Sequence, residues 1–396
     1  MRELAEPGIR RIRAALRDLQ VRRVIVWGYR EPRHTHHWVM VAMHRALEHA
    51  LRDDPSAPEL LWLDNRTVGD PAAFDDALIL SNVNVDHVDH CLPLRRRGLY
   101  LIHDHAPGRI DCSRYEPLRT AGRAVFYEVF RSRPGADYRA IEDQPLCYVH
   151  RDGDRVVMLW ATDLLPHEIE QAWQAVTERP RAAADARSVV FVGSSWTANA
   201  RELAILARDA VARGLRFEHY GRVMTPTEWP RSELVHVHGE SVSMEENVRL
   251  VREATIAPAL QGLHQLRNED GDGVGEGNYV PCRIFKNISY GAFGVSNNPT
   301  AKAVLGDAVV CRSDFGEMLD AALEQVAADP QRTALREAMV LVAKTHTYFD
   351  RMAMLIELTR DRHERMGRAV PQLRDDDRLR LGLRRVIRRS VGWSWQ

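Results

Sequence analysis

The chain has 396 residues, of which 28% are charged, and its 55 lysines and arginines balance its 55 aspartates and glutamates to a formal net charge of +0. This length exceeds the usual size of a single hydrophobic core, which predicts two domains. An even mixture of charges lacks the concentrated positive field that drives counterion release on nucleic acids. The composition therefore argues against a general nucleic-acid binder.

Cysteine usage and hydropathy indicate where the chain resides. The five cysteines show neither a CxxC pair nor regular spacing, which argues against a zinc ribbon and against a disulfide framework. The first residues, MRELAEPGIRRIR, lack the apolar segment of a signal peptide, and no uncharged apolar run approaches the roughly 18 residues that span a bilayer. We therefore expect a cytoplasmic protein, either soluble or peripheral to the inner face of the membrane.

The first half alternates short apolar runs with helical or polar stretches, beginning with VRRVIVWG at 21–28 and a helical pattern at 36–51. The further apolar runs are ELLWLD (59–64), ALILSN (77–82) and GLYLIHDH (98–105). Such runs predict a parallel sheet that is covered on both faces. Later in this half, Asp152 and Gly153 stand between two apolar runs and predict a hairpin added at the edge of the sheet.

A second cycle of strands and helices follows the linker candidate at 177–188, which contains Pro180 among small and charged residues. The cycle opens with a strand at 188–193, a helix at 199–214 and a strand at 215–221. It continues through ELVHVHG, IAPALQG, a helix at 282–290, FGVSN, AVVCRS, a helix at 315–330 and a long helical pattern from about 332 to 365. The order of elements again indicates an α/β unit.

The segment Tyr279–Pro299, YVPCRIFKNISYGAFGVSNNP, couples a helix with two cations to a glycine turn and a short apolar strand. Arg283 and Lys286 lie three positions apart, so a helix projects both from one face, where they could hold a pyrophosphate. Gly291 lets the chain leave this helix in a left-handed conformation.

This segment resembles the donor-binding helix of GT-B glycosyltransferases, and it is similar to the stretch of fucosyltransferase-like members that reads roughly YVTEKLYNALLAGAVPV. The matching positions are Tyr279, Val280, Gly291, Ala292 and Arg283, the last where that pattern has a phosphate-binding lysine. Cys282 replaces an acidic residue of the pattern, and the acidic pair of many retaining members is missing, with Asn278 and Lys286 near its positions. The resemblance covers most of residues 20–360.

The resemblance implies an α/β fold of two Rossmann-like domains that face a cleft, with the last helix returning toward the first domain. On this plan we predict an N-terminal acceptor domain over 1–180, a C-terminal donor domain over 186–355, and a helix and basic tail over 356–396. The resemblance also implies a nucleotide-diphosphate sugar, which is a substrate rather than a cofactor, and a glycan, lipid-linked or small-molecule acceptor.

Further donor-binding candidates lie at the ends of predicted strands in the second half. The turn Gly193–Ser195 leads toward a helix, so its N–H groups and hydroxyls could meet a phosphate; an ordinary turn with Thr197 or Asn199 as N-cap is the alternative. Arg222 and His238 follow later strands, where a surface arginine and a capped loop are the alternatives. The predicted donor-binding residues are Gly193, Ser194, Ser195, Arg222, His238, Tyr279, Arg283, Lys286 and Asn287.

The predicted strand LIHDH, at 101–105, carries the catalytic candidates of the first half. Strand alternation sends His103 and His105 to one face and Asp104 to the other. A histidine or aspartate at the carboxyl end of a strand can act as the general base of an inverting sugar transfer. A pair of hydrogen-bonded structural histidines is the alternative.

The motif HTHHW, at 34–38, opens the first long helix, a place where loops of GT-B enzymes often contact the acceptor. The predicted acceptor-binding residues are His34, His36 and His37. Neither HTHH nor HDH is completed by an HExxH or carboxylate pattern, and NEDGDG matches only part of a calcium loop, so we predict no metal site. Cationic side chains can instead neutralise a diphosphate leaving group, which predicts metal-independent activity.

The tail at 375–396 combines apolar residues at helical spacing with arginines and ends on Trp393 and Trp395. This composition suits an anionic membrane surface with tryptophans at headgroup depth. A disordered or surface-packed tail is the alternative.

The residues and the resemblance together predict a glycosyltransferase of the hexosyl- or deoxyhexosyl-transferring class. It would move a sugar from a nucleotide-sugar donor to a cell-envelope glycan, a lipid or a natural product. One alternative is a nucleotide-sugar epimerase of the same architecture, which needs acid and base groups around the donor but no acceptor. The other is a non-catalytic GT-B-like module that binds a partner or a glycan.

Overall fold

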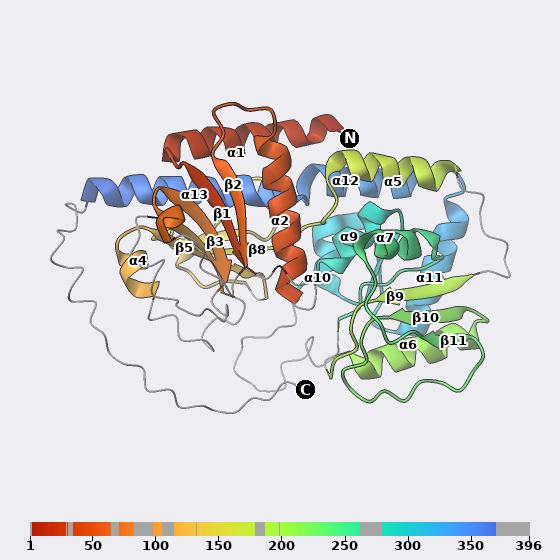
Figure 1. The fold of residues 1–396 in the computed structure, drawn as a ribbon. Helices are drawn as coiled ribbons and strands as arrows, with labels where there is room; N and C mark the ends of the chain where they lie inside the picture. The colour runs from red at the N-terminus through yellow and green to blue at the C-terminus, as the bar shows by residue number, and fades with distance from the viewer. Residues whose placement is uncertain are drawn as a thin grey trace, which may run out of the picture.

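The computed structural model describes residues 2–28, 30, 35–64, 71–82, 98–104, 115–131, 133–178, 187–197, 199–261 and 279–369. Within these ranges the chain forms two halves, each built on parallel strands with helices packed against them (Figure 1). The predicted α/β class is confirmed by the strand pairing of both halves.

The first sheet has, within the described ranges, eight strands in the order β2-β1-β3-β4-β5-β8-β7-β6. Its strands are β1 (Arg23–Gly28), β2 (Glu59–Asp64), β3 (Ala77–Asn82), β4 (Leu99–His103), β5 (Ala124–Val129), β6 (Tyr138–Ala140), β7 (Tyr148–His150) and β8 (Arg155–Met158). Strands β1 to β5 and β8 pair in parallel, whereas β7 and β6 are antiparallel. Gly153, at φ 68°, turns the chain between β7 and β8, which confirms the predicted hairpin at the sheet edge.

Helices cover both faces of this sheet because successive side chains of its buried strands point to opposite sides. One face packs on α1 (Glu6–Leu19), α2 (Thr35–Leu51) and α13 (Tyr348–Ala369). The other packs on the short elements η2 (Pro71–Phe74) and α4 (Glu116–Thr120). All residues of strand β3 are therefore buried, instead of alternating between buried and exposed.

The second half contains a sheet of order β11-β10-β9 and a parallel pair of β12 and β13. Its strands are β9 (Ser188–Val192), β10 (Arg216–Tyr220), β11 (Val235–Val237), β12 (Gly294–Ser296) and β13 (Val309–Cys311). The segment 256–259 lies between the two sheets, since Ile256 pairs with Val189 and Ala259 pairs with Ser296. The parallel arrangement thus continues from β11 to β13.

Helices also enclose the second half from both sides. One apolar cluster joins the strands to α6 (Ala200–Ala212) and α11 (Phe315–Ala328). The opposite cluster contains α5 (Pro166–Glu178), α7 (Met244–Glu253), α9 (Arg283–Tyr290) and α12 (Thr333–Thr345). The remaining described helices are η1 (Arg2–Ala5), α10 (Pro299–Leu305) and η6 (Gly306–Ala308).

The long helical pattern predicted from about 332 to 365 is wrong in one respect, because the chain breaks between α12 and α13. The break is fixed by tertiary contacts: the Thr162 N–H donates to the His346 carbonyl at 2.9 Å, and Thr162 pairs with Thr347. From this point α13 returns to the first half (Figure 1), where it packs on α1, α2, β4 and β5.

The chain crosses between the halves twice, and both crossings precede the domain boundaries predicted from the sequence. Helix α5 comes before the predicted linker but packs on α9 and α12 of the second half. The boundary predicted between 355 and 356 lies inside α13. The predicted linker core and the tail at 375–396 lie outside the described residues. Of the helices described, none has the length and apolar character needed to cross a bilayer.

Candidate functional site

Arg283 is the first residue of α9, and its side chain lies against the carboxyl end of β9. Its Nε donates to the Val192 carbonyl at 2.9 Å, and its guanidinium carbon lies 4.3 Å from the centre of the Phe191 ring. At Gly193, where φ is 150°, a Cβ atom would stand 2.2 Å from the guanidinium. The glycine therefore provides both the backbone conformation and the space that Arg283 requires.

The charge of Arg283 has no acidic partner within the described part of the chain. Burial lowers the pKa of its guanidinium, which opposes the effect of the neighbouring Cys282 and Tyr279. A partly buried cation without a counter-ion is costly, and a bound anion would relieve that cost. The arrangement is suited to a phosphate group, which a planar guanidinium can bind through two parallel hydrogen bonds.

The turn Gly193–Ser195 lies several residues before the helix that was predicted to begin at 199. Helix α6 begins only at Ala200, and the Asn199 side chain accepts from the Trp196 N–H at 2.7 Å. The N–H groups of Gly193 and Ser195 donate to the carbonyls of Tyr220 and Arg222, each at 2.8 Å. Among the described residues the Ser194 N–H has no such partner, so it is the amide of the three that can meet a ligand.

The ends of β9 and β10 approach each other closely through a second glycine. Gly221 has φ 143°, and a Cβ atom there would stand 2.3 Å from the Gly193 carbonyl oxygen. The next residue, Arg222, has an exposed side chain beside the turn. His238, just past β11, stacks on Tyr220 with ring centres 4.0 Å apart. The structure thus brings four of the predicted donor-binding positions, Gly193, Ser194, Arg222 and Arg283, to one edge of the sheet.

His103 and Asp104 point to opposite faces of the first sheet, as strand alternation predicted. His103 is buried, with its Nδ1 3.3 Å from the Asn82 amide nitrogen and its ring packed on Tyr127 and Trp160. Asp104 is also buried, and its Oδ2 accepts from Arg155 at 2.9 Å.

Arg155 also lies 3.3 Å from a carboxylate oxygen of Glu128, whose pKa is raised by burial against the lowering effect of Arg155. Asp104 is therefore part of a carboxylate–guanidinium cluster, whereas His105 lies outside the described residues.

Trp160 and Tyr279 join the two sheet edges. The Trp160 indole contacts the His103 ring edge-to-face at 5.1 Å. Tyr279 packs on the core that contains Trp160, and its hydroxyl interacts with the Trp160 side chain; burial raises the pKa of this hydroxyl. Arg283 follows Tyr279 by four positions, and Tyr279 raises its pKa, so this segment leads from the core of the first half to the end of β9.

Lys286 and Asn287 have partners inside the protein. The Lys286 Nζ lies 2.6 Å from an Asp163 carboxylate oxygen. Burial lowers and this carboxylate raises the pKa of Lys286, with a net increase. Asn287 is buried, and its amide donates to the Ala257 carbonyl at 2.7 Å. Their role in donor binding stays a prediction, and the contacts observed hold α9 in place.

The acceptor candidates lie at the beginning of α2. His37 is buried and stacks on Trp62 with ring centres 5.9 Å apart. His36 belongs to α2, but its side chain, like His34 as a whole, lies outside what the structure describes. Their contact with an acceptor stays a prediction.

A group of possible metal ligands lies away from these residues, on the hairpin between β7 and β8. Ligand atoms of His150, Asp152 and Asp154 lie within 4.8 Å of one another. Asp154 is already paired with Arg119 at 2.5 Å, so a positive charge stands where a cation would bind. The sequence prediction did not include this group, whose HxDxD spacing across a turn was the available signal.

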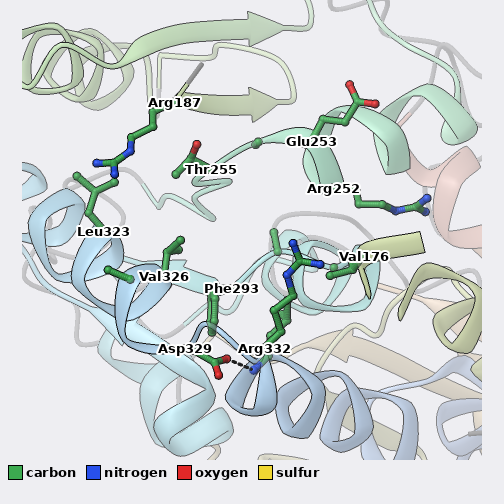
Figure 2. A pocket seen from close by; sticks show the side chains of 15 residues that line it. Val176, Arg187, Arg252, Glu253, Thr255, Phe293, Leu323, Val326, Asp329 and Arg332 are labelled. Carbon is green, nitrogen blue, oxygen red and sulfur yellow. Dashed lines mark hydrogen bonds between the residues drawn. The ribbon is translucent and has the colours of Figure 1, made fainter. Parts of the chain in front are cut away.

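A pocket of about 210 Å³, shown in Figure 2, is lined in part by Gly291 and therefore lies at the end of α9 opposite Arg283. Its walls include Arg187, Arg332 and Phe293, and it reaches Gly291, which ends α9 at φ 106° as predicted. Eight helical residues separate the two ends by about 12 Å. This pocket is therefore distinct from the place where the predicted donor-binding residues meet.

Sequence reasoning missed Trp160, Asp163 and Phe191. Trp160 and Phe191 belong to apolar runs that predict strands, so nothing local distinguished them from core residues. Asp163 follows the first-half sheet without any motif. Their roles come from contacts between distant segments.

The fold and the site define an α/β protein with a mainly parallel sheet in each half and, at the carboxyl edge of the second-half sheet, an arginine that has no acidic partner within the described residues. No family model matches the chain, and no curated protein matches it. Three solved structures that it resembles, out of a larger number, show the level of similarity.

The crystal structure of AviGT4, a glycosyltransferase involved in avilamycin A biosynthesis, is 14% identical over 88% of this chain and 97% of that chain, with a TM-score of 0.42. A UDP-forming trehalose-phosphate synthase from Burkholderia xenovorans is 12% identical over 89% of this chain and 100% of that chain, with a TM-score of 0.45. UGT89C1 from Arabidopsis thaliana, in complex with UDP-L-rhamnose, is 13% identical over 86% of this chain and 99% of that chain, with a TM-score of 0.37. At such values the function of this chain has to be inferred from its own residues.

Proposed function

We propose that this protein is a GT-B-like glycosyltransferase that moves a sugar from a nucleotide-diphosphate donor to an acceptor hydroxyl. The observation that supports this most is Arg283, a partly buried guanidinium with no acidic partner among the described residues, held over the Gly193 turn at the carboxyl edge of the second sheet. In open α/β sheets, ligands bind at this edge. The sequence resemblance of the Tyr279–Pro299 segment, which contains Arg283, supports the same assignment.

Sugar transfer leaves a nucleoside diphosphate, on which negative charge develops as the glycosidic bond breaks. Arg283 would stabilise that charge, with the Ser194 N–H and the exposed Arg222 as further donors at the same edge. Fixed donors in a partly water-excluded site stabilise a developing charge more strongly than the same groups do in water. A metal ion is not needed for this role.

We assign the general base of an inverting transfer to one of the side chains of residues 103–105. The Asp104 carboxylate is paired with Arg155, so His103 and His105 are the stronger candidates for the general base. A neutral imidazole can accept the proton of an acceptor hydroxyl as the oxygen attacks the sugar. Replacement of His103 or His105 by alanine should lower the rate of transfer more than it lowers donor affinity.

The donor is proposed to be a hexosyl or deoxyhexosyl nucleotide, and the acceptor a cell-envelope glycan, a lipid or a small natural product. An epimerase would convert the donor without any acceptor, and a binding module would leave it unchanged. Incubation of the donor with and without candidate acceptors, followed by chromatography, separates these three outcomes.

Replacement of Arg283 by alanine tests the proposal directly. Loss of one charge-assisted contact to phosphate corresponds to about 1.5–3 kcal/mol, so we expect donor affinity or turnover to fall by about 10–150-fold. Arg283→Lys should retain part of the activity, since lysine keeps the charge but not the planar geometry. Calorimetric titration with UDP and GDP measures the affinity.

Lys302→Ala is the matched control, because this exposed cation pairs with Asp307 at the surface. A folded Arg283→Ala protein with the affinity and rate of the unmodified chain would refute the phosphate assignment.

Metal independence is a second expected outcome. If side-chain cations neutralise the leaving group, transfer should continue at an unchanged rate after incubation with EDTA. Loss of activity that added Mg²⁺ or Mn²⁺ restores would instead show that a metal ion carries this role.

A further inference from the structure

Asp163 is a buried carboxylate whose two oxygens are both used by α9. Lys286 Nζ lies 2.6 Å from one oxygen, and the Tyr290 hydroxyl donates to the other at 2.7 Å. Lys286 and Tyr290 are four positions apart, so they project from the same side of the helix. The neighbouring hydroxyls of Thr162 and Ser289 lie 2.6 Å apart and add a further contact.

The segment that carries Asp163 is held from its other sides as well. Arg45 of α2 donates to the Asp163 carbonyl at 2.9 Å and also pairs with Glu168 of α5. The returning chain contributes His346, whose carbonyl accepts from Thr162 and whose ring stacks on Phe285 of α9 at 4.5 Å. Helix α9 therefore rests on the place where the chain crosses between the halves.

This arrangement separates the two cations of α9. Lys286 is compensated by Asp163, whereas Arg283, one turn nearer the start of the helix, lies over Phe191 with no acidic partner in the described residues. A buried ion pair contributes little net stability, but removal of one partner leaves an uncompensated charge in the interior. The pair is best understood as fixing the position of the helix.

We propose that Asp163 is a positioning residue: through Lys286 and Tyr290 it holds α9 so that Arg283 stays against the Gly193 turn, ready for the donor diphosphate. Asp163 itself does not touch the donor. The inference rests on the proposed function, and it assigns Lys286 to the support of the site rather than to the phosphate.

A double-mutant cycle with the full-length protein separates this assignment from direct binding by Lys286. UDP and GDP affinities are measured by calorimetry for Asp163→Asn, Lys286→Met and the double variant. We expect each single change to weaken nucleotide binding by about tenfold or more. The affinity of the double variant should be no lower than that of the more affected single variant, because either change already breaks the Asp163–Lys286 pair. Additive losses, or an unchanged affinity in folded Asp163→Asn, would overturn the proposal.

Asp307→Asn is the matched control, because it breaks a lysine–aspartate pair at the surface with the same chemical change. If Asp163→Asn fails to fold, Tyr290→Phe removes only the hydrogen bond to the other oxygen. It should give a smaller loss of affinity in the same direction, and an unchanged affinity would count against positioning.

A readout independent of the donor follows the position of α9 itself. Cys282 precedes Arg283 and packs partly buried on the first-half core, whereas Cys311 lies on β13. Maleimide labelling with peptide mass spectrometry should show faster labelling of Cys282 relative to Cys311 in Asp163→Asn, and an unchanged ratio would overturn the positioning role. If Arg283→Ala binds UDP normally, the proposed function fails, while the labelling ratio still decides whether Asp163 positions α9.

Discussion

Arg283 and Lys286 lie three positions apart on one helix, and their surroundings give the two cations different tasks. Lys286 faces the buried Asp163 carboxylate, while Arg283 faces an aromatic ring and a glycine. The pKa of the first is raised by its partner against burial, and the pKa of the second is lowered by burial. At this scale the chemistry of a residue is set by its neighbours rather than by its type.

A residue-scale prediction concerns His219, which is fully buried between Phe191 and Trp229 beneath the Gly193 turn. Burial lowers the pKa of His219 to about 4, against an ordinary value of 6.5. Between these values the unfolded chain binds a proton that the folded chain does not, so the free energy of unfolding should decrease as the pH falls from about 6.5 to about 4. His346, whose pKa burial also lowers, adds an effect of the same sign.

Urea unfolding at pH 7 and pH 5 measures this dependence. His219→Phe keeps a ring of similar shape without a titrating group. The variant should show a smaller difference between the two pH values. An identical pH dependence in both proteins would show that His219 does not contribute.

At the scale of elements, the site depends on how strands β9 and β10 end. Each strand is followed by a glycine with positive φ, which lets the two backbones approach and leaves a place for the first turn of α9. A strand that ended in an ordinary residue would direct its side chain into Arg283. The meeting of β9 and α9 thus requires glycine for both conformational and steric reasons.

Replacement of Gly193 by alanine should therefore weaken donor binding as well as stability. Strain at a positive φ costs about 1–3 kcal/mol, and the new methyl group would displace the Arg283 guanidinium. Thermal unfolding and UDP titration measure the two effects. Gly214→Ala is the control, because φ there is 68° and nothing lies within 4 Å of the added carbon. Equal donor affinity in both variants would show that Gly193 has no part in positioning Arg283.

At the scale of the molecule, the two halves are joined by two passes of the chain that pair with each other. Thr162 on the outward pass binds His346 and pairs with Thr347 on the return. Helix α13 then extends along α1 and α2 of the first half, up to Ala369. Further contacts between the halves are made by Arg45 of α2 with Glu168 of α5, and by η1 with α5 and α12.

The tail gives a prediction at this scale. Six arginines lie between Arg378 and Arg389, and each basic residue near an anionic leaflet contributes about 1 kcal/mol. Truncation from Arg378 onward should abolish sedimentation with phosphatidylserine vesicles and leave UDP affinity unchanged. Equal vesicle binding by both proteins, or binding by neither at low salt, would contradict a membrane role for the tail.

Much of the fold was predictable because its signals are local. Buried runs such as ALILSN predicted β3, the Asp152-Gly153 pair predicted the hairpin, and Gly291 predicted the end of α9. The break at His346 was not predictable, since the surrounding residues are compatible with one continuous helix. It exists because Thr162, from the segment that leads out of the first half, binds there.

The sequence by itself determined which segments are strands and helices and that a helix with two cations ends on a glycine. Only the tertiary structure decided that Lys286 and Tyr290 are held by Asp163, which lies 127 positions before Tyr290. It also decided that the Arg283 side chain lies against the Gly193 turn. The physical reason is that periodicity and capping act within a few residues, whereas the partner of a buried charge is chosen by the packing of segments that meet only after folding.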